Sequence, residues 1–526
     1  MTKNTYIKGA GILAMGGLMS RFIGLFYKSI ITKILGSYAI GLYYNTFYIF
    51  SFLLSFLISA VPLSISKMTA EKTALGYEQD INKMMRTLFL FLSILGFVFT
   101  VILFRYSQFI ISLAKWDPQT YYPLIGISFS PMIIVCICII RGYFQGINNM
   151  KPTAVSQIIE SIVRLIVGVP LCYYLTIKYS QSIGAGGATL GTTISEGFSL
   201  VVLFYFYLRY KDKRNIKVKI YDYKESSQLS ILKRFIQISL PVSISSVIIS
   251  VYGMINSFTY PSSMGKAGLS LAKATEIFGD YCNANTLANI PLTFSMALSM
   301  AVIPTIAQSY ILKDKKAISY KVRMAIRLVL ISGLPSIIGL ALLAKQLFPL
   351  IFNQSLYGSE LLKWNSISIG FIMLSMTFQS MLQGLDNFHS PIKNLLVGLV
   401  VKWALNIILI PIPSLHIYGM VISNTASYAL LAGLNLRDLH QCIPFKMKAR
   451  DVILPLINSI LMGGFVWMLK NILIRQFHDA ITIVIVTFSG AIVYLILLVV
   501  TGTLKEKDFN SLPYGNKIKN FYKGLK

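Results

Sequence analysis

Apolar runs long enough to cross a lipid bilayer recur along the whole chain, and they constrain its fold more than any motif does. Uncharged stretches such as 88–101, 198–208 and 481–500 each form the centre of a segment near the ~20 residues that a spanning helix needs. The composition agrees, because a soluble chain with 55% apolar and only 13% charged residues would aggregate. The sequence therefore predicts an all-α integral membrane protein with no soluble domain of any size.

Basic residues indicate how these segments are oriented. The sequence predicts about fourteen membrane-spanning segments, near residues 9–32, 41–66, 87–113, 121–146, 152–177, 184–208, 235–258, 276–305, 324–344, 364–385, 392–412, 416–436, 451–469 and 480–501. With the N-terminus inside, Lys and Arg collect in the cytoplasmic loops, as they should: the internal stretch 209–234 carries nine, and the external loop 411–416 carries none. Both termini are therefore expected in the cytoplasm, and the first segment should remain as a helix instead of being cleaved as a signal peptide.

The formal net charge of +29 follows from the same loops. Basic loops that face the anionic lipid of the inner leaflet account for most of it, so membrane lipids are expected partners and nucleic acid is not. We expect a multi-pass protein of the plasma membrane. The abundance of Ile, Lys, Asn and Tyr suggests an AT-rich genome and favours a Gram-positive source.

An internal repeat divides the chain into two similar halves. Three short motifs recur in the same order at offsets between 232 and 242 residues. They pair Gln145-Gly146 with Gln383-Gly384, Gly187 and Gly191 with Gly419 and Ser423, and Pro62 with Pro304. Small residues one helical turn apart, as in the second pair, are expected to let helices approach closely.

The repeat predicts two six-helix lobes. Six is an even number, so both lobes have the same topology and are related by an axis along the membrane normal, as in transporters that rock one half against the other. The predicted parts are an N-terminal lobe (1–208), a basic cytoplasmic loop (209–234), a C-terminal lobe (235–440), two further spans (441–504) and a basic cytoplasmic tail (505–526). The substrate site is expected between the lobes.

Ionisable residues inside the spans are the candidates for function, because each is costly there unless it is paired or wet. Arg21 and Lys28 lie two helical turns apart on the first span and share a face. That span carries no carboxylate, so the two cations suit a cavity that receives an anion. The alternative for Lys28 is that its ammonium group snorkels to the external interface.

Three later spans carry further charges. Glu160 and Arg164 stand at i and i+4, where carboxylate and guanidinium meet on one helix face, although such a pair can also be purely structural. Lys402 has no carboxylate near it in sequence, and the repeat aligns it close to Arg164, so a cation from each half would line one space. Glu196 is a candidate partner for one of these cations. Several cations in one cavity would offset the charge of phosphates.

Patterns typical of catalysis are lacking. The four histidines are scattered, and Cys136 and Cys138 point to different faces of a helix, so neither a zinc site nor a disulfide framework is expected. A glycosyltransferase would need carboxylates in a sizeable exposed loop, but the longest candidate, 209–234, is basic and short. We expect neither an enzyme nor a bound metal or cofactor.

The region after residue 140 resembles a known family. The stretches 141–146, 150–154 and 160–164 are similar to those of the stage V sporulation protein B and MurJ-type polysaccharide flippases of Gram-positive bacteria. Segments that look like the same family, and extend the resemblance over nearly the whole chain, are 20–24, 62–67, 256–259 and 512–517. The resemblance implies the multidrug/oligosaccharidyl-lipid/polysaccharide (MOP) exporter fold: fourteen helices, two lobes forming a V-shaped cavity, and two last helices beside a lipid-facing groove.

The resemblance also implies a cargo. It would be an undecaprenyl-diphosphate-linked glycan such as lipid II, flipped from the inner to the outer leaflet for peptidoglycan assembly. Arg21 matches the arginine of the family's first span and is expected to contact the diphosphate, whereas Lys28, Arg164 and Lys402 are candidates from their chemistry alone. The expected polar partners in the cavity are Glu160, Glu196 and Asn256.

Other cargoes and couplings stay open. One alternative is export of a precursor of teichoic acid or capsule, and a sporulation-specific role is not distinguished from a vegetative one. Another alternative is drug or cation antiport, which would need carboxylates in the cavity, where this chain supplies mainly cations. Some members of the family are thought to bind sodium through an acidic residue of the seventh span, where this chain has Asn256. Coupling to the membrane potential or to a monovalent cation is therefore left open, and the cell-wall synthesis machinery is a candidate partner.

Overall fold

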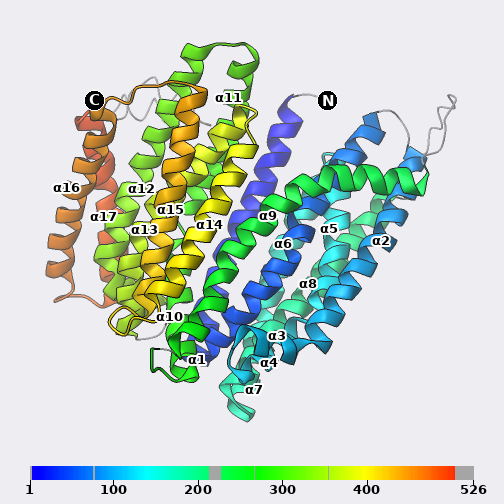
Figure 1. Cartoon of the computed structure of the whole chain (residues 1–526), viewed down its shortest axis with the longest axis horizontal. Helices are drawn as coiled ribbons and strands as arrows, with labels where there is room; N and C mark the ends of the chain where they lie inside the picture. The colour runs from blue at the N-terminus through cyan, green and yellow to red at the C-terminus, as the bar shows by residue number, and fades with distance from the viewer. Residues whose placement is uncertain (1–2, 75–77, 212–226, 266, 353–354, 504–526) are drawn as a thin grey trace. The chain divides into compact units, whose positions relative to one another are not determined.

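The structure, a computed structural model, describes residues 3–74, 78–211, 227–265, 267–352 and 355–503. All regular elements in these ranges are helices (Figure 1). Thirteen helical stretches are long and apolar enough to cross a membrane, and the first, Met15–Ala74, has the length of two crossings. The all-α membrane architecture expected from the apolar runs is confirmed. The predicted loop 209–234 lies largely, and the predicted tail 505–526 wholly, outside the described residues.

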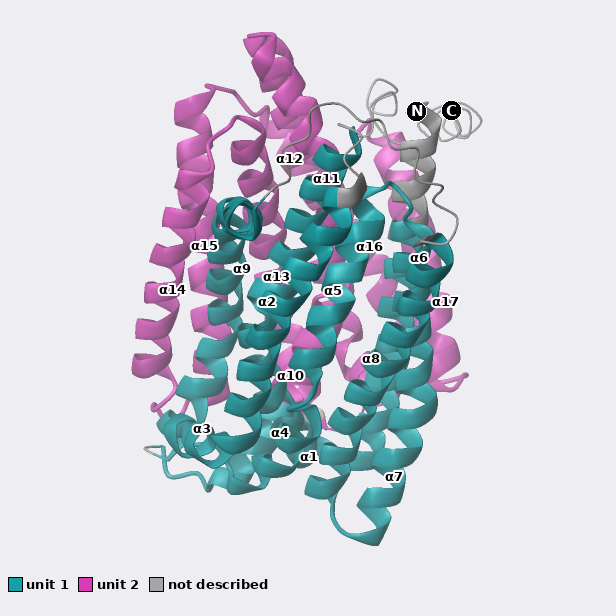
Figure 2. Cartoon of the chain, turned by 90° about the vertical axis from the view of Figure 1, so that its right-hand side faces the viewer, with its two compact units in different colours: residues 1–279 teal, residues 280–526 magenta. Residues whose placement is uncertain are grey.

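The chain divides into two compact units, Met1–Gly279 and Asp280–Lys526 (Figure 2). Helices of the first unit are α1 (Lys3–Ala74), α2 (Glu78–Arg105), α3 (Ser107–Ala114), η1 (Pro118–Thr120), α4 (Tyr121–Ile127), α5 (Ser130–Gly146), α6 (Lys151–Val163), η2 (Arg164–Gly168), α7 (Val169–Lys178), α8 (Gln181–Lys211), α9 (Gln228–Met264) and the start of α10 (Leu271–Ala288). The second unit holds the end of α10, then α11 (Leu292–Ile311), α12 (Lys315–Ile351), α13 (Leu356–Gly384), α14 (His389–Leu409), α15 (Ile417–Cys442), α16 (Ala449–Leu473) and α17 (Asp479–Val500). Helix α9 falls in the first unit because it packs along α1. The lobe boundaries taken from the repeat stay a prediction.

Helix α1 contains both of the first two predicted spans, joined by a sharp break at Gly36. This residue has φ 72° and ψ 173°, a backbone conformation open essentially to glycine alone. In Figure 1 the blue chain reverses its direction near the label α1. Gly36 therefore ends one helix and begins the next, so α1 consists of two successive spans.

The sequence repeat reappears as matched backbone geometry at two helix ends. Asn148 follows α5 with φ 57°, and Asp386 follows α13 with φ 62°. In both turns the next amide donates to the carbonyl five residues earlier at 2.9 Å, which closes the helix in the same left-handed motif. Asn and Asp tolerate this conformation better than other side chains do.

The two glycines before these turns also make equivalent contacts. A Cβ atom on Gly146 would lie 2.7 Å from the carbonyl oxygen of Ser66, and one on Gly384 would lie 3.1 Å from that of Ile303. The contacted residues Ser66 and Ile303 lie 237 positions apart, close to the spacing of the two glycines. Pro62 and Pro304 lie 242 positions apart, so the two prolines do not take equivalent places in this packing. The turn motif of the repeat is thus matched in backbone geometry and in packing.

The second repeated motif marks close approaches between helices, as expected. A Cβ atom on Gly191 of α8 would stand 2.3 Å from the Cα atom of Gly168, and one on Gly419 of α15 would stand 2.7 Å from the carbonyl carbon of Leu409. Real Cβ atoms do not come this near to backbone atoms. Only a residue without a side chain lets these helices cross at the observed separation.

Two predicted spans are interrupted: 87–113 breaks at Tyr106, between α2 and α3, and 276–305 has a wider break. Residues 276–305 do not form a single helix, because α10 ends at Ala288 and α11 begins at Leu292. Pro291 stands directly before α11. Its ring crowds the carbonyl of Leu287 and it has no N–H to donate, which favours a break in the helix at this point.

Candidate functional site

The candidate site is built on a helix with one widened turn. Helix α6 continues through η2, a π turn that begins at Arg164, into α7. Pro170 lies in the first turn of α7, has no N–H and crowds the carbonyl of Ile166, so the hydrogen-bond ladder has to loosen just before it. Such π turns are frequent at functional sites.

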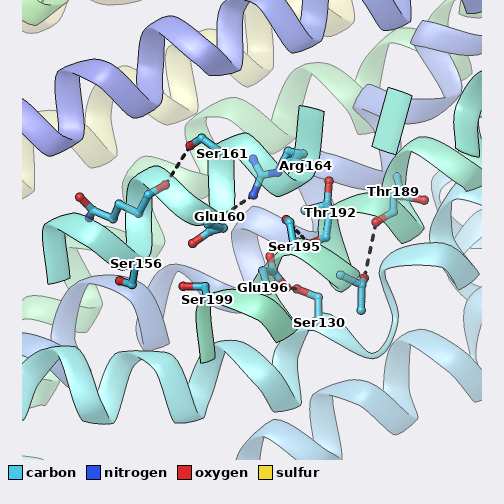
Figure 3. A network of polar contacts seen from close by, with 12 residues as sticks. Ser130, Ser156, Glu160, Ser161, Arg164, Thr189, Thr192, Ser195, Glu196 and Ser199 are labelled. Carbon is cyan, nitrogen blue, oxygen red and sulfur yellow. Dashed lines mark hydrogen bonds and ion pairs between the residues drawn. The ribbon is translucent and has the colours of Figure 1, made fainter. Parts of the chain in front are cut away.

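Two arginines share one carboxylate beside this turn. Glu160 Oε1 accepts a bond of 2.8 Å from Arg164, and Glu160 Oε2 accepts one of 3.0 Å from Arg141 of α5. The i,i+4 pair expected from the sequence is thus confirmed, and Figure 3 shows Glu160 and Arg164 facing each other. The three side chains, which we call the arginine cluster, are 16–22% exposed, so they are neither sealed in the protein nor free in solvent.

Arg141 and Arg164 differ in how firmly they are held. Arg141 also donates to Ser156 Oγ at 3.1 Å and to Ser199 Oγ of α8 at 3.2 Å. Within the described part of the chain, Arg164 donates to Glu160 alone, and its Nε atom is buried without a hydrogen-bond partner. Arg141 is therefore anchored from three sides, whereas Arg164 has unused donors.

Glu196 lies next to the arginine cluster on α8. Its side chain is 3% exposed and accepts a hydrogen bond from the Ser130 hydroxyl (Figure 3). Arg141 and Arg164 are near enough to interact with it electrostatically, but Glu196 forms no direct ion pair among the residues described. No group of three or more His, Cys, Asp or Glu residues in the described ranges could hold a metal ion.

The two candidate cations of the first span lie on α1. Arg21 is exposed and Lys28 is half-buried, with its Nζ atom 5.1 Å from the ring centroid of Tyr44. A cation over an aromatic face is a favourable contact, so Lys28 has a local reason for its position besides anion binding. Both belong to the same unit as the arginine cluster.

Asn256 and Lys402 are both buried. Asn256 lies in α9 of the first unit and is 3% exposed. Lys402 lies in α14 of the second unit and is 2% exposed. The expectation that Lys402 and Arg164 line one space stays a prediction.

Reasoning from the sequence missed Arg141 as a site residue. Its contacts are with residues 15, 19 and 58 positions away, so no spacing rule along one helix could find them. A signal was present nonetheless, because Arg141 is a charged residue inside the predicted span 121–146 and begins the stretch that carries the family resemblance.

Comparison with known proteins agrees with these features. The family described as "Polysaccharide biosynthesis protein" matches residues 6–310, more than half of the chain. Stage V sporulation protein B of Bacillus subtilis is 27% identical over 523 residues, 98% of each chain. The lipid II flippase MurJ of the same Gram-positive bacterium is 24% identical over 516 residues, 93% of this chain and 94% of the flippase.

Solved structures show the same fold. A lipid II flippase MurJ in an inward closed conformation matches with a TM-score of 0.70 at 18% identity, over 93% of this chain and 98% of that one. An inward-facing multidrug MATE transporter of the MOP superfamily matches with a TM-score of 0.67 at 15% identity, over 80% and 95%. The activities named for these proteins are transport and not catalysis. The chain is thus a multi-pass protein of the cell membrane, similar to proteins of Gram-positive bacteria. It belongs to the polysaccharide biosynthesis protein family and has the fold of the MOP-superfamily transporters.

Proposed function

We propose that the protein flips an undecaprenyl-diphosphate-linked glycan, foremost the peptidoglycan precursor lipid II, from the inner to the outer leaflet by alternating access. The observation that carries the proposal is the arginine cluster, in which Arg164 lies inside a membrane span and its Nε donor is buried without a hydrogen-bond partner. Guanidinium groups bind phosphate oxygens in a bidentate manner, and such bonds are strong in a low dielectric. The relative that is a lipid II flippase covers nearly the whole chain, which supports the same cargo.

The proposed contacts to the diphosphate come from Arg21, Lys28, Arg164 and Lys402. Their proposed polar partners are Glu160, Glu196 and Asn256. No cofactor takes part. After release of the cargo, a transporter with a cationic site can be returned to its inward-facing state by the membrane potential, which is negative inside, or by a monovalent cation. The potential contributes ~2.3 kcal/mol per charge per 100 mV. The glycan-lipid and the surrounding lipids are direct partners, and the cell-wall synthesis machinery is a further proposed one.

A second cargo has one observation in its favour. The sporulation protein is 27% identical to this chain and the lipid II flippase is 24% identical, so a glycan of sporulation, or another precursor such as that of teichoic acid or capsule, is the alternative. All of these cargoes share the lipid-linked diphosphate. The arginine cluster would serve each of them.

Complementation tests the proposal. The essential lipid II flippase of a Gram-positive host is depleted, this chain is expressed, and growth and outer-leaflet lipid II are scored. Wild type should rescue both, Arg21→Ala and Arg164→Gln should not, and Arg234→Gln, which removes an exposed arginine paired with Glu71, should behave as wild type. Failure of well-expressed wild type would exclude lipid II and leave the alternative cargoes.

A further inference from the structure

The unequal anchoring of the two arginines on Glu160 suggests a role for this carboxylate. Arg141 is fixed by Ser156, Ser199 and Glu160 together, whereas among the residues that the structure describes Arg164 is held by Glu160 alone. An arriving anion can therefore draw Arg164 away at the cost of one bond. Glu160 would keep its second bond, to Arg141, and would not become an isolated buried charge.

We propose that Glu160 is a resident anion, which occupies Arg164 while the transporter is empty, yields Arg164 to the diphosphate of the cargo, and takes it back when the cargo leaves. The inference rests on the proposed function and adds a release step to it. Glu160 is a positioning residue here, because it acts on the cargo through Arg164. Its neighbour Glu196 is bound by Ser130 and does not compete for the guanidinium in a direct ion pair.

A transporter of this kind needs such a competitor. Arginines that bind a diphosphate strongly in a low dielectric also release it slowly, and a cargo that is not released is not transported. When the site is empty, arginines without a counter-charge are costly inside the membrane. A carboxylate that is always present reduces both costs. It neutralises the arginines of the empty site, and it speeds release of the cargo by taking the place of the diphosphate on Arg164.

A purely structural ion pair would look different. A pair kept for stability has its donors satisfied, as Arg141 has with three partners. Arg164 leaves its Nε atom buried and unpartnered although the side chain is 22% exposed. It also begins the π turn, where the backbone ladder is already loosened. These are properties of a side chain that exchanges partners.

The test uses the full-length protein in nanodiscs with undecaprenyl diphosphate as the anionic probe and undecaprenol as the neutral one. Glu160→Gln keeps the shape of the side chain and removes its charge. We expect it to bind undecaprenyl diphosphate on the order of tenfold more tightly than wild type, to bind undecaprenol equally, and to flip a labelled lipid-linked substrate more slowly. Glu276→Gln, which removes the carboxylate of the exposed pair Lys273–Glu276, is the matched control and should change none of these values.

Each outcome separates the inference from the proposed function. If wild type binds undecaprenyl diphosphate and Glu160→Gln binds it no more tightly, the resident-anion role is wrong and the flippase proposal stands. If wild type does not bind the diphosphate lipid at all, both are wrong. Arg164→Gln leaves Glu160 paired with Arg141, so it should stay folded and lose diphosphate binding, and undiminished binding would overturn the inference.

If the Glu160→Gln variant is unstable in the absence of ligand, its melting temperature provides a second test. Its two arginines then lose the carboxylate with which they form ion pairs, so undecaprenyl diphosphate should raise its melting temperature by more than it raises that of wild type. An equal or smaller rise would contradict the proposed exchange.

Discussion

The indole Nε1 of Trp116 donates a hydrogen bond of 2.8 Å to the backbone carbonyl of Ser257. Pro261 follows Ser257 by four residues within α9 and has no N–H to give to that carbonyl. The indole thus replaces the missing bond of the helix ladder. In apolar surroundings this matters, because a backbone carbonyl without a partner costs several kcal/mol in lipid.

Trp116→Phe should therefore destabilise the protein. The phenyl ring can still pack against Phe258, whose ring centroid lies 5.3 Å from that of the indole, but the donor is lost. We expect a loss of about 1–3 kcal/mol in the free energy of unfolding, read as a lower melting temperature in detergent. Trp467→Phe, at a position that is 57% exposed, is the control, and equal losses in both variants would refute the explanation.

Tyr494→Phe should loosen the last helix. Tyr494 Oη of α17 donates a hydrogen bond of 2.8 Å to the backbone carbonyl of Ile331 in α12. This carbonyl receives no bond from within its own helix, because the residue four positions later, Pro335, has no N–H. Without the hydroxyl we expect a loss of about 1–3 kcal/mol and faster hydrogen–deuterium exchange in α17. Tyr173→Phe, at a position of α7 that is 56% exposed, is the control and should leave hydrogen–deuterium exchange in α17 unchanged. If exchange in α17 is also unchanged in Tyr494→Phe, the bond from Tyr494 to Ile331 does not stabilise α17.

Gly191→Ala and Gly197→Ala should have opposite effects although both lie in α8. The new methyl group at 191 would meet the Cα atom of Gly168 at 2.3 Å, whereas nothing lies within 4 Å of one at 197. We expect the first to cost about 1–3 kcal/mol or to abolish folding, and the second to be neutral or to stabilise by up to ~1 kcal/mol through helix propensity. The yield of folded protein and its melting temperature are measured for both variants. Similar values for the two would contradict a tight contact between Gly191 and Gly168.

The repeated turn should respond alike in both halves. Asn148 and Asp386 have φ 57° and 62°, so replacement by Val should destabilise by ~1–2 kcal/mol at each position, and replacement by Gly should be tolerated. Melting temperatures of the four single variants test this. Destabilisation by Val in one half only would show that the two turns are not equivalent in solution.

Local patterns predicted much of the architecture. Apolar runs indicated the spans, and the glycines near 187 and 419 indicated helix crossings, because both signals act within one helix or at its surface. The spacing of Glu160 and Arg164 predicted their pair for the same reason. The break before Leu292 was not predicted, although Pro291 is a local signal for it, because the apolar run continues across the proline.

Contacts between distant segments were beyond such patterns. A proline shows that the carbonyl four residues earlier loses its donor, but not that Trp116 or Tyr494 will supply another. Likewise Arg141 could be recognised as a charge in a span, but its position on Glu160 depends on how α5 packs beside α6 and α8. These parts of the site follow from tertiary packing.

The equivalent turns at Asn148 and Asp386 are the pattern that a gene duplication followed by fusion leaves in a chain. Because each copy is predicted to hold six spans, both copies enter the bilayer from the same side. The unfused ancestor could then have worked as a parallel pair of identical subunits, with no need to insert in two orientations. Once two such copies are joined, each can change its charges independently, as the predicted alignment of Lys402 close to Arg164 requires.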